Sequence, residues 1–355
     1  MQYLTDDVRI TGMQEVIAPE SLMQQLPISA EASSLVFTTR QQIADIIHKK
    51  DDRLLAIIGP CSIHDPTAAL EYAGKLADLA RKYRDNLLIV MRVYFEKPRT
   101  IVGWKGLIND PHLNNSYDIN EGLAVARKLL LDINELGLTA GTEYLDPITP
   151  QYVGDLVSWG AIGARTTESQ IHRQLASGLS CPIGFKNSTD GSIQIAVDAI
   201  KSSSHSHIFL SVTKQGHSAI FSTSGNPDCH IILRGGSNGT NYDKVSIADT
   251  KEKLAAGDVD AGIMVDMSHA NSQKDHSKQI LVCESICHQL ADGETDIVGV
   301  MVESNLKPGR QNITADPAGL IYGQSITDAC IGWEDSEKVL AQLNTAVQQR
   351  RQSGT

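Results

Sequence analysis

Short apolar runs alternate along this chain with longer segments whose apolar residues recur at helical spacing. The runs are uninterrupted, which is typical of parallel strands buried on both faces. Eight strands are predicted, at residues 54–59, 87–93, 138–142, 161–165, 182–186, 230–234, 262–266 and 297–302.

Helical periodicity fills most of the intervals between these runs. Helices are predicted at residues 67–81, 120–136, 167–179, 192–202, 245–256 and 275–292. The clearest is 120–136, with Asn120 as its N-cap and Gly137 as its stop. Strands that alternate with helices indicate an α/β fold, a (β/α)8 TIM barrel. A doubly wound open sheet is the alternative, since short apolar runs do not reveal closure.

Two segments fall outside the eightfold pattern. Residues 1–50 are polar and read as irregular until a helical stretch at 41–49, and we expect an N-terminal extension for regulation or oligomerisation. Residues 207–224 place two apolar runs around TKQG, which predicts a β-hairpin inserted into the barrel. The catalytic barrel is then expected over residues 51–350. A hairpin of this kind is either regulatory or merely decorative.

Charge and cysteine content narrow the class of protein. The formal net charge of -11 argues against nucleic acid and against an anionic membrane surface as partners. Six cysteines in 355 residues are too sparse for a disulfide scaffold and indicate a reducing compartment. The N-terminus lacks the apolar core of a secretory signal, and no apolar run is long enough to span a bilayer. A cytoplasmic location is expected.

Nearly every predicted strand ends in or near a charged residue, and a barrel brings these strand ends together at one mouth. Six of the charged residues there are cations: Arg92, Lys97, Arg99, Arg165, Lys186 and Arg234. Such crowding in an acidic protein is unfavourable unless anions occupy the site. Guanidinium and ammonium groups suit phosphate and carboxylate. The mouth is therefore expected to bind a strongly anionic ligand with more than one phosphate.

A second set at the same mouth combines a thiol, an imidazole and carboxylates. Its members are Cys61, His269, Glu303 and Asp328. Together these groups suit one divalent ion such as manganese, iron, cobalt or zinc. The alternative is a packed cysteine, a hydrogen-bonded histidine and two solvated acids.

Several long motifs carry a resemblance to a known family. They are GPCSIHD, MRVYFEKPRTIVGWKGLINDP, GARTTESQIHR, GFKNSTDG, HIILRGG, DMSHANS and QSITDACIGWED. In this order, and over essentially the whole chain, they closely resemble type I 3-deoxy-D-arabino-heptulosonate 7-phosphate (DAHP) synthase. The resemblance implies the first step of the shikimate pathway. In that step phosphoenolpyruvate, erythrose 4-phosphate and water give a seven-carbon keto acid phosphate and inorganic phosphate.

The resemblance also implies roles for residues. Cys61, His269, Glu303 and Asp328 match the metal ligands, and Arg92, Arg165, Lys186 and Arg234 match the phosphoenolpyruvate clamp. Lys97 would lie between the substrates, as a candidate acid for the forming alkoxide. Arg99 and Thr100 match the erythrose 4-phosphate contact, and Glu143 and Asp266 are expected to line the site. Cys330 follows Asp328 closely, and we hypothesise that oxidation joins it to Cys61 and expels the metal.

Members of this family are often inhibited by an aromatic amino acid bound away from the active site. The acidic pair Asp6 and Asp7 matches a contribution from a neighbouring subunit, and Gln151, Ser180 and Ser211 match pocket residues. Ser211 resembles the phenylalanine-sensitive branch, whereas Pro147 resembles the tyrosine-sensitive one. Phenylalanine is favoured, tyrosine is the alternative and tryptophan is least favoured. A homo-oligomer, with dimers paired into a tetramer, is implied.

Three other functions compete with this one. An octulosonate phosphate synthase would use arabinose 5-phosphate, and KPRT together with the N-terminal extension favours the shorter aldehyde. A catalytically dead barrel that senses an aromatic amino acid would not need every ligand and clamp residue. A sugar-phosphate isomerase would not need a metal site with a thiolate.

Overall fold

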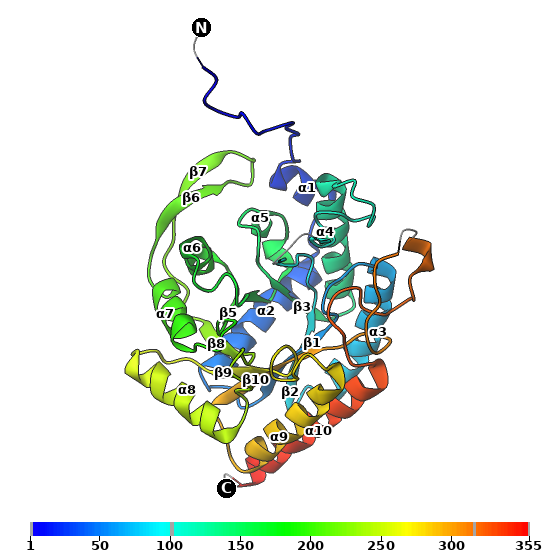
Figure 1. Ribbon diagram of the computed structural model, residues 1–355. Helices are drawn as coiled ribbons and strands as arrows, with labels where there is room; N and C mark the ends of the chain where they lie inside the picture. Colours follow the sequence, from blue (N-terminus) through cyan, green and yellow to red (C-terminus); the bar gives the residue numbers. More distant parts are fainter. Residues whose placement is uncertain (1–2, 100–102, 315–316, 354–355) are drawn as a thin grey trace.

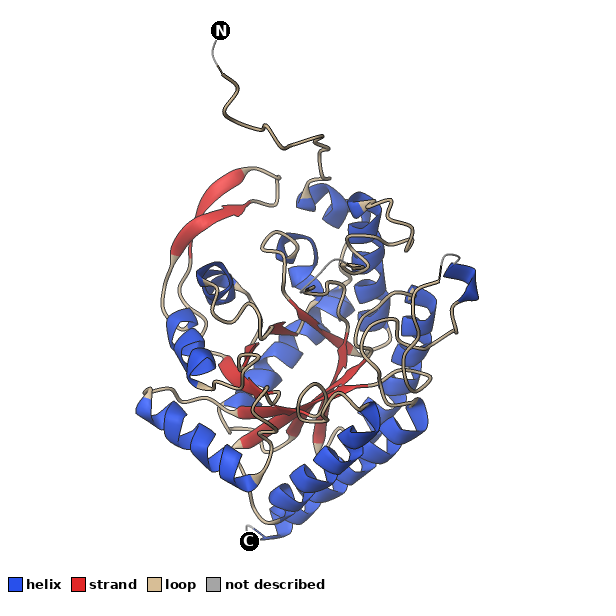
Figure 2. Cartoon of the chain, in the orientation of Figure 1, coloured by secondary structure: helices blue, strands red, loops and turns tan. Residues whose placement is uncertain are grey.

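Eight parallel strands close into a barrel at the centre of the molecule (Figures 1 and 2). The computed structural model describes residues 3–99, 103–314 and 317–353. The barrel strands are β1 (Leu54–Gly59), β2 (Leu87–Arg92), β3 (Thr139–Glu143), β4 (Trp159–Ile162), β5 (Ile183–Lys186), β8 (Cys229–Leu233), β9 (Ile263–Asp266) and β10 (Ile297–Glu303). Closure occurs where β1 pairs with both β2 and β10. The predicted TIM barrel is confirmed, and the open sheet is wrong.

Helices form a layer around the barrel (Figure 2). They are α3 (Pro66–Tyr83), α4 (Ile119–Glu135), α5 (Pro150–Val153), α6 (Gln170–Gly178), α7 (Gln194–Ser203), α8 (Lys244–Ala256), α9 (Gln279–Ala291) and α10 (Trp333–Ser353), with short 3-10 turns η1 (Gly154–Leu156), η2 (His276–Lys278) and η3 (Pro317–Gly319). Alternate strand residues face opposite ways. One set, including Leu55, Ile57 and Met301, fills the barrel interior, and the other packs under the helices.

The segment before the barrel is more ordered than its polar sequence indicated. The prediction of an irregular chain until residue 41 is wrong, because α1 (Pro19–Gln25) lies before that point and α2 (Ala30–Ile47) begins before it. Ile43, Ile46 and Ile47 of α2 belong to the same apolar cluster as the barrel interior. These apolar residues stabilise α2 by packing against the barrel interior. The division of the chain into two domains at residue 50 stays a prediction.

Two other local predictions need correction. Asp118, not Asn120, caps α4, since its carboxylate accepts a hydrogen bond from the Glu121 amide. Asn120 instead accepts from the Ile17 amide, which ties the N-terminal segment to the helix. Strand β4 ends before residue 165, so Arg165 lies in the following turn rather than at a strand end.

The inserted hairpin is confirmed as β6 (Ile208–Val212) paired with β7 (Ser218–Ser222). It curves away from the barrel beside α6 and α7 (Figure 1). The N-terminal segment projects from the body next to α1 and the hairpin turn. Within the described residues, no helix is long and apolar enough to cross a membrane.

Two helical glycines differ in the space around them, and this yields a prediction. A Cβ at Gly74 in α3 would meet no heavy atom within 4 Å, whereas at Gly122 in α4 it would lie 2.1 Å from the Ile108 carbonyl oxygen. Gly74→Ala should therefore stabilise the protein by about 1 kcal/mol through helix propensity. Gly122→Ala should destabilise it by roughly 1–3 kcal/mol through overpacking. Denaturant unfolding measures both, and equal shifts in the two variants would contradict the packing at Ile108.

Candidate active site

A cavity of about 130 Å³ opens at the carboxyl ends of the barrel strands. It gathers side chains that lie far apart in the sequence. Its lining residues are Arg92, Lys97, Pro98, Arg99, Glu143, Gly163, Ala164, Arg165, Lys186, Thr189, Arg234, His269 and Asp328. All six predicted cations are present, so the expected crowding of positive charge at one mouth is confirmed. Thr100 lies outside the described residues.

Arg92 is the most deeply buried of these cations, with a side chain only 1% exposed. Its guanidinium donates to Glu303 Oε1 at 3.0 Å and to the carbonyl oxygens of Pro60 and Cys61. The same group stacks 3.5 Å from the centre of the Tyr94 ring. Burial acts to lower the pKa of Arg92, but the groups around it, Tyr94 and Glu303 foremost, outweigh burial and raise the pKa above its usual range. The side chain is thus a fixed positive charge.

Lys97 lies against a thiol beneath the mouth, and Lys186 lies against a carboxylate. Lys97 Nζ is 3.1 Å from Cys61 Sγ, and Lys186 Nζ is 3.1 Å from Asp266 Oδ2. Burial lowers the pKa of Lys97, but Cys61 and Glu303 together outweigh it and raise the pKa above its usual range. Burial acts to raise the pKa of Asp266, yet His269 and Lys186 hold it well below its usual range. Lys97 therefore keeps its proton at neutral pH, and Asp266 is ionised.

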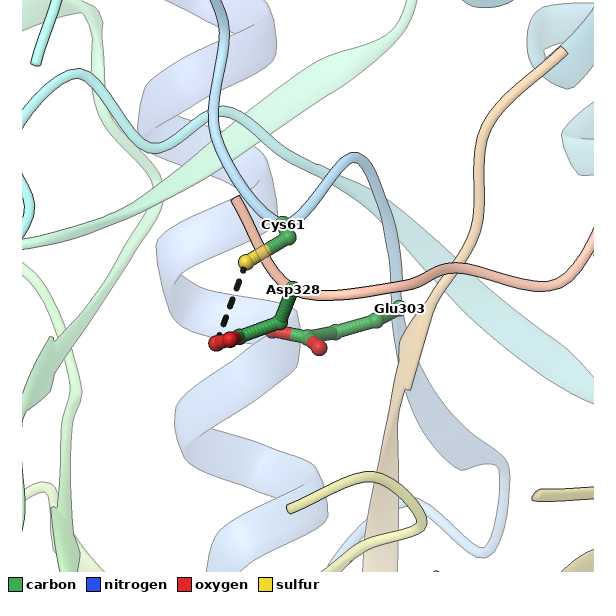
Figure 3. A group of neighbouring side chains, drawn as sticks. All are labelled: Cys61, Glu303 and Asp328. Atoms are coloured by element: carbon green, nitrogen blue, oxygen red, sulfur yellow. Dashed lines mark hydrogen bonds between the residues drawn. The ribbon is translucent and has the colours of Figure 1, made fainter. Parts of the chain in front are cut away.

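Three of the four predicted metal ligands form a compact cluster (Figure 3). Potential ligand atoms of Cys61, Glu303 and Asp328 all lie within 4.8 Å of one another, and Cys61 Sγ is 3.6 Å from Asp328 Oδ2. Cys61 follows β1, Glu303 ends β10 and Asp328 comes from the loop before α10. Barrel closure therefore brings together residues separated by up to 267 positions.

His269 stands at the edge of this cluster. Its Nε2 atom is 3.9 Å from Glu303 Oε1, and its Nδ1 atom is 2.9 Å from Asp266 Oδ2. A proton on Nδ1 that is shared with that carboxylate leaves the lone pair of Nε2 available to a metal ion at the cluster. The backbone of His269 is held at φ 57°, a left-handed conformation that costs about 1 kcal/mol or more in a residue with a Cβ.

The donor atoms fit a divalent metal ion. One thiol and two carboxylates, with an imidazole nitrogen oriented by a second carboxylate, are a ligand set for a borderline transition metal. Burial raises the pKa of Cys61 to about 11, and the charge of Glu303 adds to that increase. A positive ion bound here would favour the thiolate that the buried site alone disfavours.

Sequence reasoning missed the residues that position the clamp. Asn187 follows β5, and its side-chain oxygen accepts from the Arg234 amide at 2.8 Å. Asn241 accepts from the Gly235 amide and donates to Asn187. Both asparagines are buried and hold the backbone at Arg234 in place. Asn187 directly follows Lys186. Its position, one residue past the end of β5, is the feature of the sequence that could have marked it as part of the site.

A second cavity, of about 690 Å³, lies between α5, α6 and the β6–β7 hairpin. Gln151, Ser180 and Ser211 line it together, as predicted, beside the rings of Phe209 and Phe221. Asp6 and Asp7 are not among its lining residues. They belong to the exposed N-terminal segment of the same chain, and their contribution to a neighbouring subunit stays a prediction.

Glu96 is a buried acid between the two cavities that sequence reasoning also missed. Its carboxylate accepts from the Thr149 hydroxyl at 3.0 Å and from the Asp146 amide at 3.3 Å. Burial, reinforced by the charge of Asp146, raises the pKa of Glu96 to about 8. Glu96 is therefore linked to both cavities. Lys97, the next residue, lines the first cavity, and Gln151, two residues after Thr149, lines the second.

A closed (β/α)8 barrel with a cationic mouth beside a potential metal cluster defines a class of protein, an enzyme for anionic, phosphorylated substrates. Comparison with known proteins narrows the class. Residues 25–341 match the model of the DAHP synthetase I family.

Two curated relatives and one solved structure are similar over nearly their full lengths. The Phe-sensitive phospho-2-dehydro-3-deoxyheptonate aldolase of Escherichia coli K12 is 58% identical over 351 residues, which cover 99% of this chain and 100% of that protein. The Trp-sensitive enzyme of the same organism is 53% identical over 346 residues, covering 98% and 99%. A structure from Francisella tularensis SCHU S4, of an enzyme with the same aldolase name, superposes with a TM-score of 0.94 at 53% identity, covering 96% of this chain and 99% of that one.

This chain belongs to the DAHP synthetase I family. Its reaction is the condensation of phosphoenolpyruvate with erythrose 4-phosphate, with release of phosphate.

The raised pKa of Glu96 predicts a pH dependence of stability. Between its ordinary value of 4.5 and about 8, the unfolded chain loses this proton while the folded chain keeps it. The carboxyl group therefore lowers the free energy of unfolding progressively as the pH rises through that window. Glu96→Gln has no such proton, so its stability relative to the parent should rise by a few kcal/mol, on the order of 1.4 per pKa unit. Urea unfolding across this pH range measures the difference, and parallel curves would contradict the burial of Glu96.

Proposed function

We propose that this chain is a metal-dependent 3-deoxy-7-phosphoheptulonate synthase regulated by an aromatic amino acid. The observation that carries the proposal is the convergence of six cations and a Cys–Glu–Asp cluster on one barrel mouth. Both substrates are phosphorylated anions and repel one another. Cations fixed around them offset this repulsion and hold the reacting carbons at attack distance.

The cations divide into an inner and an outer group, which supports an assignment of roles. Arg92 and Lys186 already face carboxylates at the bottom of the mouth. Arg165, Arg234 and Arg99 make no ion pair within the described residues and are available to a ligand. Arg92, Arg165, Lys186 and Arg234 are assigned to the phosphate and carboxylate of phosphoenolpyruvate. Arg99, with Thr100, is assigned to the phosphate of erythrose 4-phosphate.

Cys61, His269, Glu303 and Asp328 are assigned as ligands of one divalent ion, of which manganese, iron, cobalt and zinc all suit the donor set. When bound, such an ion polarises the aldehyde carbonyl and orients it. Asp266 keeps the proton of His269 on Nδ1, and so keeps Nε2 available for binding. The catalytic set is then Cys61, His269 and Lys97.

Lys97 is assigned as the acid that protonates the forming alkoxide. Its ammonium group lies over Cys61 Sγ, at the boundary between the cluster and the cationic clamp. A raised pKa keeps this proton in place until an oxyanion of higher basicity forms beside it. Glu143 lines the same cavity, whereas the expected Asp266 is not among its lining residues and lies against Lys186 and His269 instead. One oxygen of Glu143 has no protein partner among the described residues and is suited to position the attacking water.

The second cavity is assigned to the regulatory amino acid. Phe209, Phe221 and Leu175 offer apolar surface for an aromatic ring, and Gln151, Ser180 and Ser211 offer polar groups for the amino-acid end. Phenylalanine is favoured, in line with Ser211 and with the name of the Escherichia coli Phe-sensitive relative. Tyrosine is the alternative. Asp6 and Asp7 of a neighbouring subunit would complete the pocket, in a cytoplasmic dimer or tetramer.

The first test is a phosphate-release assay on chelator-treated protein. Activity with phosphoenolpyruvate and erythrose 4-phosphate should be lost with the metal and return with added manganese. Phenylalanine should lower it more than tyrosine or tryptophan does. Arabinose 5-phosphate in place of the four-carbon aldehyde is the control for the octulosonate reaction. Turnover only with the five-carbon sugar would overturn the substrate assignment, and none with either would leave the sensor function.

The metal assignment predicts a difference between two buried thiols. Cys61→Ser should weaken the tightest cobalt(II) binding by about 100-fold or more and reduce the sulfur-to-cobalt absorption band, because a thiolate ligand is lost. Cys330→Ser is the matched control, since this thiol is buried in the same region but lies outside the cluster. A band of unchanged intensity and affinity in Cys61→Ser would exclude Cys61 as a ligand. All six cysteines are free here, and the Cys61–Cys330 disulfide stays a prediction.

A further inference from the structure

Two thiols stand one helical turn apart on α9, on the outer layer of the barrel. Cys283 Sγ and Cys287 Sγ are 3.9 Å from one another. Helix α9 runs beside α10 (Figure 1), and Cys283 also lies 3.6 Å from the Gln342 side-chain oxygen of α10. Neither thiol belongs to the cavity or to the metal cluster of the barrel mouth. The proposed catalytic function does not use this pair.

The pair is accessible from one side. Cys283 is fully buried, whereas Cys287 is half-buried and lines a groove of about 370 Å³ between α9 and α10. Glu284 and His288 line the same groove. The sequence CESICH thus sets two i, i+4 pairs side by side on one turn, one of sulfur donors and one of oxygen and nitrogen donors.

The sulfur separation matches a metal-bridged pair rather than a disulfide. Zinc–thiolate bonds of about 2.3 Å in a tetrahedron place two sulfur atoms roughly 3.8 Å apart. The observed 3.9 Å meets this requirement with almost no movement of the helix. A disulfide needs about 2.05 Å, which would force two side chains of one rigid turn much closer together. Ligands at i and i+4 on a helix are a known arrangement for zinc.

We propose that Cys283 and Cys287 form a second metal site for a thiophilic divalent cation such as zinc or cadmium. Each thiol releases its proton to solvent as its sulfur–metal bond forms, and no electron is transferred. Water from the groove completes the coordination, because among the described residues Glu284 and His288 do not form a compact donor cluster with the two thiols. The ion fastens one turn of α9 beside α10, so its effect is on the stability of this helix pair.

Cadmium titration of the full-length protein tests the site, in a Cys61→Ser background that removes the thiolate of the barrel mouth. The cadmium–thiolate absorption band should saturate at one ion per chain, and bound cadmium should raise the unfolding temperature. Adding Cys287→Ser should weaken this binding by at least about tenfold and abolish the temperature shift. Adding Cys229→Ser, a buried thiol elsewhere, is the matched control and should change neither.

Two results would overturn the proposal. One is a thiolate band of equal affinity in the Cys287→Ser variant, which would place the bound cadmium elsewhere. The other is no thiolate band in the background protein although a thiol reagent modifies Cys287, which would make the pair ordinary packing residues. Neither result bears on the synthase assay, so failure here leaves the proposed catalytic function unaffected.

Discussion

The buried ion pair between Arg92 and Glu303 is the interaction on which the mouth of this barrel depends. It links the ends of β2 and β10 across β1, with both side chains 2% exposed or less. Burying two charges is unfavourable unless their geometry is good and the remaining hydrogen-bonding atoms are satisfied. Here Arg92 Nε donates to the Pro60 carbonyl, and Nη2 donates to the Cys61 carbonyl as well as to Glu303. One guanidinium therefore fixes both a cluster carboxylate and the backbone that carries the cluster thiol.

A second buried carboxylate lies close to this pair. Asp266 lies between Lys186 and His269, while Lys97 lies beside the Cys61 thiol. The inner charges largely compensate each other, which lets a protein of net charge -11 hold six cations around one small cavity. Compensation stops at the rim, where Arg99, Arg165 and Arg234 find no carboxylate among the described residues. The unbalanced positive charge is thus located where an incoming anion arrives.

The sequence predicts features that depend on local patterns and misses features that depend on contacts between distant residues. Strand boundaries and the charged strand ends were readable because a parallel barrel forces apolar runs inside and polar residues to one rim. The first part of helix α2 was missed because its buried residues before the predicted stretch at 41–49, Ala32, Val36 and Thr39, include only one large apolar side chain. Asn120 was mistaken for a cap because its true partner, the Ile17 amide, is 103 residues away. The raised pKa of Glu96 likewise arises from burial, which no short motif records.

Glu96 also explains how the two cavities can affect one another. Thr149 directly precedes Pro150 and Gln151, which line the larger cavity, and its hydroxyl donates to the Glu96 carboxylate. Lys97 follows Glu96 and lies over Cys61. A ligand that displaces the start of α5 must either break a hydrogen bond to a buried carboxyl or carry Glu96 with it. An unsatisfied buried polar group costs about 1–3 kcal/mol, so the second outcome is favoured. Any movement of Glu96 is passed through the next peptide bond to the backbone of Lys97, and so to the lysine between the cation clamp and the metal cluster.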